Sequence, residues 1–220
     1  MQPIRNDKLT FTWNTKCSCY QFSLPPRLSC PGVEERLQNP KSICNFCYAF
    51  HGRSGQMKNA KELLRRNWKV CHKKGGRLLG DFQQAFREIP EGQEYFRWFG
   101  CGDICWESLF IVMWAIAQDF PHIKFWAPTQ TVWGTPRVYP RNLVIRQSAT
   151  CIGEPAPSGG HCTLLPGQKA PRGTFTCPGK CDPCRKCWEP WNPKQRIAFP
   201  FHGSAILMAK LNKARRVHNF

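Results

Sequence analysis

The stretch CPGKCDPCRKCW limits the possible folds of this chain more than any other, because it places four cysteines within eleven residues. Cys177, Cys181, Cys184 and Cys187 are separated by three, two and two residues. This spacing is too tight for two unstrained disulfides and suits four thiolates that converge on one centre. Zinc and an iron–sulfur cluster both accept four cysteine ligands, so the spacing leaves both open. The alternative to a functional metal centre is a structural one whose metal only stabilises the fold of the loop.

Residues 151–193 around this motif are rich in Pro, Gly and Cys and have no hydrophobic periodicity. We therefore expect their order to come from something other than a hydrophobic core. Cys162 is a spare candidate for the case in which one of the four cysteines is not a ligand. The chain then divides into an α/β core over 1–150, a cysteine-rich metal-binding insertion over 151–195, and a strand and helix over 196–220 that complete the core.

Outside the insertion, strand-like and helix-like segments alternate, which is typical of α/β proteins. Strands are expected at 20–24, 94–103, 123–127, 143–147 and 196–201. Helices are expected at 56–71, 78–89, 108–118 and 205–216. The strand–helix–strand unit in the middle of the chain favours a parallel strand pair. The fold class is therefore α/β, as a partial (β/α) barrel of parallel strands with a cysteine-rich C-terminal insertion.

A second group of cysteines, Cys30, Cys44 and Cys47, follows the first expected strand. A structural zinc site would need a fourth ligand, which His51 or Cys71 could supply. Three ligands are sufficient for a [4Fe–4S] cluster with one open iron, which can bind a substrate or cofactor. The position favours this second interpretation, because the first loop of a β/α barrel presents ligands at the C-terminal ends of the strands. We assign no role to Cys17 and Cys19.

The net charge of +18 indicates a polyanionic partner, and nucleic acid is the usual one. A basic surface without a specific partner is the alternative. The densest basic cluster, with an interleaved aromatic residue, suits phosphate contacts and stacking on a base, or equally a solvated helix face. This cluster consists of Arg65, Arg66, Trp68, Lys69, Lys73, Lys74 and Arg77.

The fourteen cysteines make the compartment important. The N-terminus has no apolar segment of a secretory signal, and no apolar run approaches the ~20 residues of a membrane span. We therefore expect a cytoplasmic protein with no membrane partner. Thiols are kept reduced there, so clustered cysteines more often bind metal than form disulfides.

Several ordered motifs together resemble the phage gene-product-88 family, over roughly residues 20–205: FSLPPRLSCPG, CNFCYA, FRWFGCGD, IKFWAPTQ, CDPCRKCW and IAFPFHG. That family looks like a compact, divergent relative of the radical S-adenosylmethionine (SAM) enzymes. The resemblance implies the host cytoplasm as the location. Radical SAM enzymes use a Cys-x3-Cys-x2-Cys loop with an aromatic residue before the last cysteine. Phe46 takes that place, whereas the first gap here is thirteen residues long.

The resemblance implies that Cys30, Cys44 and Cys47 hold a [4Fe–4S] cluster whose open iron binds SAM. The motif GCGD, with Gly100, Gly102 and Asp103, is the nearest match to the stretch that holds the SAM amino group. A role for Asp103 as the N-cap of the following helix is an equally good interpretation.

Two further residues at a strand end, Arg146 and Ser148, are placed to reach the SAM carboxylate or ribose, or else are an ordinary exposed pair. Cys177, Cys181, Cys184 and Cys187 would then hold a second, auxiliary [4Fe–4S] cluster, with zinc as the other possibility.

The implied reaction is one-electron cleavage of SAM to a 5′-deoxyadenosyl radical, with the electron supplied by a reductant protein. The high positive charge makes a nucleic acid or nucleotide the expected substrate, and modification of a base in phage DNA is one such reaction. The alternative is a non-catalytic nucleic-acid-binding protein with two structural cysteine-rich zinc or iron–sulfur sites, which needs only the charge and the cysteines.

Overall fold

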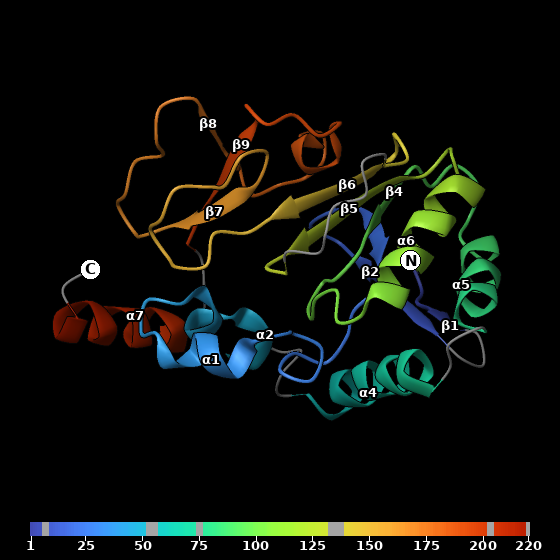
Figure 1. Cartoon of the computed structure of the whole chain (residues 1–220), viewed down its shortest axis with the longest axis horizontal. Helices are drawn as coiled ribbons and strands as arrows, with labels where there is room; N and C mark the ends of the chain where they lie inside the picture. The colour runs from blue at the N-terminus through green and yellow to red at the C-terminus, as the bar shows by residue number, and fades with distance from the viewer. Residues whose placement is uncertain (6–8, 52–56, 74–76, 132–138, 202–204, 219–220) are drawn as a thin grey trace.

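The computed structural model describes residues 1–5, 9–51, 57–73, 77–131, 139–201 and 205–218. Its strands form two sheets, one of six strands in the order β1-β2-β3-β4-β5-β6 and one of three in the order β7-β9-β8 (Figure 1). The strands are β1 (Ile4–Arg5), β2 (Thr10–Asn14), β3 (Cys19–Gln21), β4 (Tyr95–Arg97), β5 (Lys124–Thr129), β6 (Leu143–Gln147), β7 (His161–Leu164), β8 (Thr174–Thr176) and β9 (Arg196–Pro200).

The helices lie between and after these strands. The α-helices are α1 (Val33–Gln38), α2 (Tyr48–His51), α4 (Lys58–Lys73), α5 (Leu78–Arg87), α6 (Glu107–Asp119) and α7 (Ala205–His218). Two short 3₁₀ helices are η1 (Ile43–Phe46) and η2 (Lys186–Trp188). No helix in the described part of the chain is both long and apolar enough to cross a membrane.

The six-stranded sheet is mostly parallel. β3, β4, β5 and β6 pair with one another in parallel, and β1 and β2 add an antiparallel hairpin at one edge. The unit β4–α6–β5 is the parallel strand–helix–strand unit predicted from the sequence. The α/β fold with parallel strands is therefore confirmed, while the edge hairpin was not anticipated.

One face of this sheet carries the main hydrophobic core, which helices α4, α5 and α6 cover (Figure 1). In α6 the apolar side chains recur three and four residues apart, so they lie on one face of the helix. Leu109, Val112, Met113 and Ile116 are all buried on that face, as their spacing predicted. In α4 the fully buried Asn67 accepts a hydrogen bond from the Thr10 backbone N–H (2.9 Å), which ties this helix to β2.

The opposite face of the sheet is covered by the cysteine-rich segment. The indole N–H of Trp188 donates to the Phe96 carbonyl of β4 (2.9 Å), and its ring centroid lies 5.1 Å from that of Trp126 of β5. A second small core forms around Cys162, Leu164 and Ala198.

The insertion therefore contains a hydrophobic core, contrary to our expectation. Its strands β7 and β8 each have only three or four residues, too few for a visible periodicity, and they are held by β9, which lies between them. We expected this last strand to complete the core formed by residues 1–150. It belongs instead to the smaller sheet.

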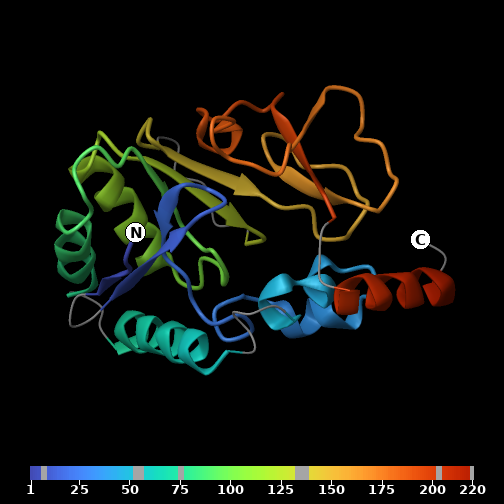
Figure 2. The same ribbon diagram turned by 180° about the vertical axis from the view of Figure 1, so that it is seen from behind.

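Helix α7 contacts the loop that carries the first group of cysteines. Its buried Leu211 packs with Phe46 of η1 and with Ile152. α7, α1 and α2 lie together at the end of the molecule opposite α5, in both views (Figures 1 and 2).

Candidate functional site

The segments that leave β3 and β4 stay side by side beyond the ends of both strands. The Phe22 N–H donates to the Arg97 carbonyl (3.1 Å), the Gly100 N–H to the Phe22 carbonyl (3.0 Å), and the Leu24 N–H to the Cys101 carbonyl (3.0 Å). This pairing brings the loop that begins at Leu24 and contains the three cysteines next to the GCGD motif, at the C-terminal ends of the parallel strands.

Both glycines of that motif allow close approach of neighbouring residues. Gly102 has φ +84°, and a Cβ there would lie 2.5 Å from the Ser29 hydroxyl oxygen and 2.9 Å from the Leu24 carbonyl oxygen. A Cβ on Gly100 would lie 2.5 Å from the side-chain nitrogen of Gln21. The GCGD loop can therefore pack against the segment before Cys30 only because these side chains are absent.

Asp103, the acidic residue of the motif, connects the ends of β4 and β5. It is 5% exposed; its Oδ1 accepts from the Ile104 N–H (2.7 Å) and the Thr129 hydroxyl (2.5 Å), and its Oδ2 from the Gln130 N–H (2.9 Å). Burial raises the pKa of the Asp103 carboxyl, and these hydrogen bonds oppose that rise. Asp103 is not the N-cap of α6, because that position belongs to Trp106. Its observed role is to organise the strand ends.

The three cysteines lie in this same region. The pKa of Cys30 is raised to about 12, first by burial and then by the charges of Asp103, Cys47 and Cys44. Burial also raises the pKa of Cys47, and the Cys44 thiol donates to the side-chain oxygen of Gln130 (3.5 Å). The three thiols are thus electrostatic neighbours. Across the described residues, however, no three His, Cys, Asp or Glu side chains are already arranged so that they could hold a metal ion.

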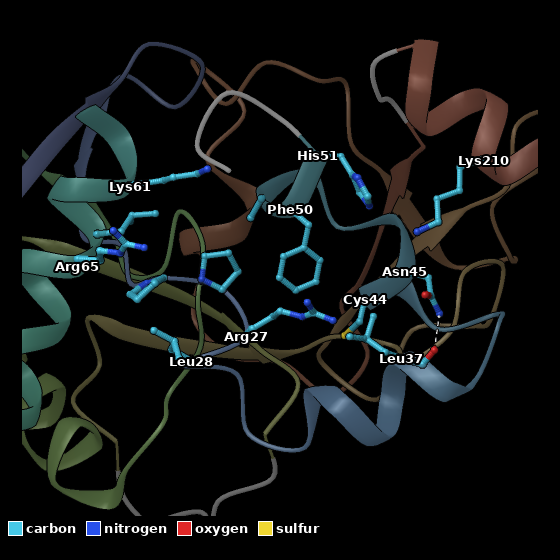
Figure 3. A pocket seen from close by; sticks show the side chains of 14 residues that line it. Arg27, Leu28, Leu37, Cys44, Asn45, Phe50, His51, Lys61, Arg65 and Lys210 are labelled. Carbon is cyan, nitrogen blue, oxygen red and sulfur yellow. Dashed lines mark hydrogen bonds between the residues drawn. The ribbon is translucent and has the colours of Figure 1, made fainter. Parts of the chain in front are cut away.

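The two proposed fourth ligands lie in different places. Cys71 is buried in the main core on α4, with Cys105 and Asp81 as its electrostatic neighbours. His51 lines the same cavity as Cys44 (Figure 3). Of the two residues, only His51 shares a cavity with a cysteine of the loop, so His51 is the one candidate left for the fourth ligand.

That cavity has a volume of about 600 Å³ and a strongly basic wall (Figure 3). Its cationic residues come from three segments: Arg27 from the loop before Cys30, Lys61 and Arg65 from α4, and Lys210 from α7. The guanidinium carbon of Arg27 lies 5.6 Å from the centre of the Phe50 ring, which also lines the cavity. Sequence reasoning missed Arg27 and Lys61, because their convergence with the other cationic residues depends on the fold.

The predicted basic cluster on α4 is divided by the structure. Arg65 lines the cavity, and Arg66, Lys69 and Arg77 are exposed. Trp68 is half-buried: its ring centroid lies 4.8 Å from that of Trp106, and the side chain packs against the main core. These contacts place Trp68 on the core side of α4, and its stacking on a base stays a prediction. Lys74 and the side chain of Lys73 lie outside the described residues.

Arg146 and Ser148 at the end of β6 have partners in the C-terminal region. Arg146 is fully buried and donates five hydrogen bonds to residues between Gly159 and Gln195. The Ser148 hydroxyl lies 2.7 Å from Nε2 of His161. Burial, with the charges of Arg146 and Arg97, lowers the pKa of His161 to about 3. The observed role of Arg146 is to hold the cysteine-rich segment on the sheet.

Of the four clustered cysteines, Cys177, Cys181 and Cys187 belong to one hydrophobic cluster with Cys17 from the N-terminal part of the chain. The Cys181 and Cys17 sulfur atoms are 3.4 Å apart. Cys19, at the start of β3, belongs to the same buried cluster. Cys17 and Cys19 thus lie among the cysteines of the C-terminal motif, a position that the sequence did not predict.

The family model described as gene product 88 matches residues 3–154. The chain belongs to the gene product 88 family. The match includes the three-cysteine loop and the GCGD motif, and it confirms the family resemblance seen in the sequence; the relation to radical SAM enzymes stays a prediction. Neither the search of curated proteins nor that of solved structures found a match.

Proposed function

We propose that this member of the gene product 88 family is a radical SAM-like iron–sulfur enzyme that acts on a nucleic acid or nucleotide. The observation that carries the proposal is the position of Cys44. It belongs to the three-cysteine loop and also lines the basic cavity, close to the C-terminal ends of the parallel strands. Ligands of α/β proteins with parallel strands bind at those ends.

The chemistry of the three-cysteine loop fits an iron–sulfur cluster. Thiolates are soft ligands that select iron–sulfur clusters, zinc or copper over magnesium and calcium. Cys30, Cys44 and Cys47 would hold the cluster after their side chains rotate toward it, since they are neighbours that do not yet form a metal site. When bound, the cluster with SAM supplies a one-electron cleavage that generates a hydrogen-abstracting radical, with the electron supplied by a reductant protein. The protein contributes position and exclusion of water.

The residues of the cavity suit a phosphate-bearing substrate. Lys61 and Arg65 are exposed on α4 and four residues apart, so they lie on the same side of the helix. With Arg27 and Lys210 they would neutralise phosphates, and the Phe50 ring offers a face on which a base could stack. The exposed pair of Arg27 with Glu34 (3.3 Å) is weak and would exchange for a phosphate.

The parallel pairing between the two sheets supports the expected partial barrel. Ser148, just after β6, forms a parallel bridge with His161 of β7, and β7 is parallel to β9. Parallel strands then succeed one another from β3 to β6 and, through this bridge, to β7 and β9. Such an arrangement would curve around the cavity side of the sheet and give the cofactor a partly enclosed site.

An anaerobically purified protein tests the proposal. We expect iron and sulfide in the wild type and 5′-deoxyadenosine after addition of SAM and dithionite. Cys44→Ala should lose both. Cys71→Ala, whose thiol lies in the core, is the matched control and should retain both. A colourless protein that binds zinc and nucleic acid and releases no 5′-deoxyadenosine would contradict the proposal and favour the non-catalytic binding protein.

The open coordination position requires a separate test, because His51 lies in the same cavity as Cys44. His51→Gln should leave the iron content and the perturbation of the cluster's electron paramagnetic resonance signal by SAM unchanged. An equal loss of iron in His51→Gln and Cys44→Ala would mean that the histidine closes the site, and the SAM reaction would then have no place to occur.

A further inference from the structure

The cysteine-rich segment is joined to the turn between β2 and β3, at the other end of the chain. The Cys17 and Cys181 sulfur atoms are 3.4 Å apart. The Cys181 N–H donates to the Lys16 carbonyl (3.3 Å), and the Arg185 guanidinium donates to the Cys17 carbonyl (2.5 Å). Thiols and backbone groups of two segments 164 residues apart therefore form one contact.

Three more thiols surround this contact. Cys19 and Cys187 are buried, Cys177 is half-buried, and all three belong to one hydrophobic cluster with Cys17 and Cys181. Among the described residues, Cys184 takes part in none of the contacts found between these thiols. The structure therefore gathers a different set of cysteines from the four that the sequence motif indicated.

The distance between the Cys17 and Cys181 sulfur atoms is that of a thiol–thiol hydrogen bond, and it is also short enough for two ligands of one metal ion. Two thiolates on one tetrahedral zinc ion, each ~2.3 Å from the metal, are ~3.8 Å apart. A disulfide would need ~2.05 Å and would leave the other three thiols unused. In a [4Fe–4S] cluster each cysteine binds a different iron, which separates the sulfur atoms further than ligands of one ion. The observed 3.4 Å is closest to the single-ion case.

The surroundings balance the charge of such a centre. Four thiolates around one divalent ion carry net negative charge, which burial makes unfavourable unless cations lie nearby. The guanidinium of Arg97 interacts electrostatically with Cys17, Cys19 and Cys187. The guanidinium of Arg185 lies against the Tyr95 ring, 4.1 Å from its centre, directly beside the Cys17 carbonyl.

We propose that the protein holds a single zinc ion between Cys17 and Cys181, completed by two of the three thiols Cys19, Cys177 and Cys187. Cys184 is not a ligand. The thiols do not yet form a complete metal site, so their side chains rotate when zinc binds. The ion fastens the β2–β3 turn to the cysteine-rich segment and keeps that segment on the sheet. This site is independent of the three-cysteine loop and of the SAM reaction.

Matched cysteine variants test the site. The wild-type protein and Cys184→Ser should each bind one zinc at this site by mass spectrometry, and cobalt substitution should give the intense thiolate charge-transfer bands of a tetrahedral site. Cys17→Ser and Cys181→Ser should lose at least about tenfold in zinc affinity. Loss in Cys184→Ser with retention in Cys17→Ser would overturn the assignment, as would iron and sulfide that disappear from Cys17→Ser.

A measurement on the unmodified chain avoids the risk that a variant does not fold. Zinc should protect Cys17 and Cys181 from alkylation, while Cys184 reacts, and a chelator should abolish the protection. A Cys17–Cys181 disulfide in the metal-free protein, with no protection by zinc, would refute the site. Failure here leaves the iron content of the Cys30, Cys44 and Cys47 loop unchanged, so the two proposals fail separately.

Discussion

Replacement of Arg146 by methionine should detach the cysteine-rich segment from the sheet. The guanidinium donates to the carbonyls of Gly159 (2.7 Å), Lys186 (3.3 Å), Cys187 (3.2 Å) and Glu189 (3.0 Å) and to the Gln195 side chain (2.7 Å). One buried cation thus binds five acceptors of a segment that has little regular structure.

The magnitude follows from the acceptors that the substitution leaves behind. Each acceptor that stays buried without a donor costs about 1–3 kcal/mol, but a loosened segment would let water reach several of them. Because the bonds are mutually dependent and therefore not additive, we expect Arg146→Met to lower the free energy of unfolding by about 3–5 kcal/mol. Arg146→Lys keeps the charge but has fewer donors, and about 2–3 kcal/mol should be lost.

Urea denaturation followed by tryptophan fluorescence measures this loss, since Trp188 lies on the same segment and packs against Trp126. Arg141→Met is the control, because Arg141 is exposed, and it should change stability by less than about 0.5 kcal/mol. If Arg146 instead binds the SAM carboxylate, Arg146→Met would weaken SAM binding and leave the denaturation midpoint in place. That result would refute the structural role.

Three further predictions concern the sheet and the cavity. Gly102→Ala should lower the free energy of unfolding by more than about 1 kcal/mol, because the residue has a positive φ and a Cβ would meet Ser29. Gly92 also has a positive φ but has open space where a Cβ would lie, so Gly92→Ala should lose less stability, and equal losses in a denaturation experiment would contradict the role of the Ser29 contact. The folded protein favours the neutral form of His161, so as the pH falls this histidine is protonated in the unfolded chain before it is protonated in the folded protein. The free energy of unfolding should therefore fall by about 2 kcal/mol between pH 7.5 and pH 5. His161→Gln should flatten that part of the pH profile of stability, and an unchanged profile would refute the role of His161. The double substitution Lys61→Gln and Arg65→Gln should reduce the salt dependence of single-stranded DNA binding by about two phosphate contacts, and the control Arg141→Gln should not. An unaltered salt slope in the double variant would mean that Lys61 and Arg65 do not contact the phosphates.

The main sheet and its helices could be predicted from the sequence because they are built from local patterns. The strand expected at 143–147 is β6, and the buried face of α6 is the one that its three- and four-residue spacing indicated. For Trp68 the same spacing indicates a place on the buried side of helix α4, although the charged residues around it favoured the basic surface. It follows Leu64 by four residues and precedes Cys71 by three, so it belongs to the apolar side of the helix. The surrounding arginines and lysines made it look like part of the basic surface.

The partners of Arg146 could not be predicted, because a strand's alternation tells only which side chains share a face. Val144 and Arg146 are both buried on one face of β6. Which segment covers that face depends on β7, β8 and β9, and β9 reaches its place between the other two from beyond the insertion. The position of Arg146 at a strand end therefore predicted that it binds SAM, whereas in the folded chain its guanidinium donates to four backbone carbonyls and to the Gln195 side chain.

The cysteines make the same point for metal sites. Spacing along the chain predicts which thiols can reach one ion, and for Cys177, Cys181, Cys184 and Cys187 it predicts all four equally well. The β2–β3 turn adds Cys17 at 3.4 Å from Cys181, and a tetrahedral ion accepts only four ligands. A ligand supplied by the turn must then displace a member of the motif, and Cys184 is the member without a contact to the other thiols in the described residues. A zinc site of this composition would make the docking of the C-terminal segment depend on metal, so removal of zinc should loosen that segment and leave the core formed by α4, α5 and α6 intact.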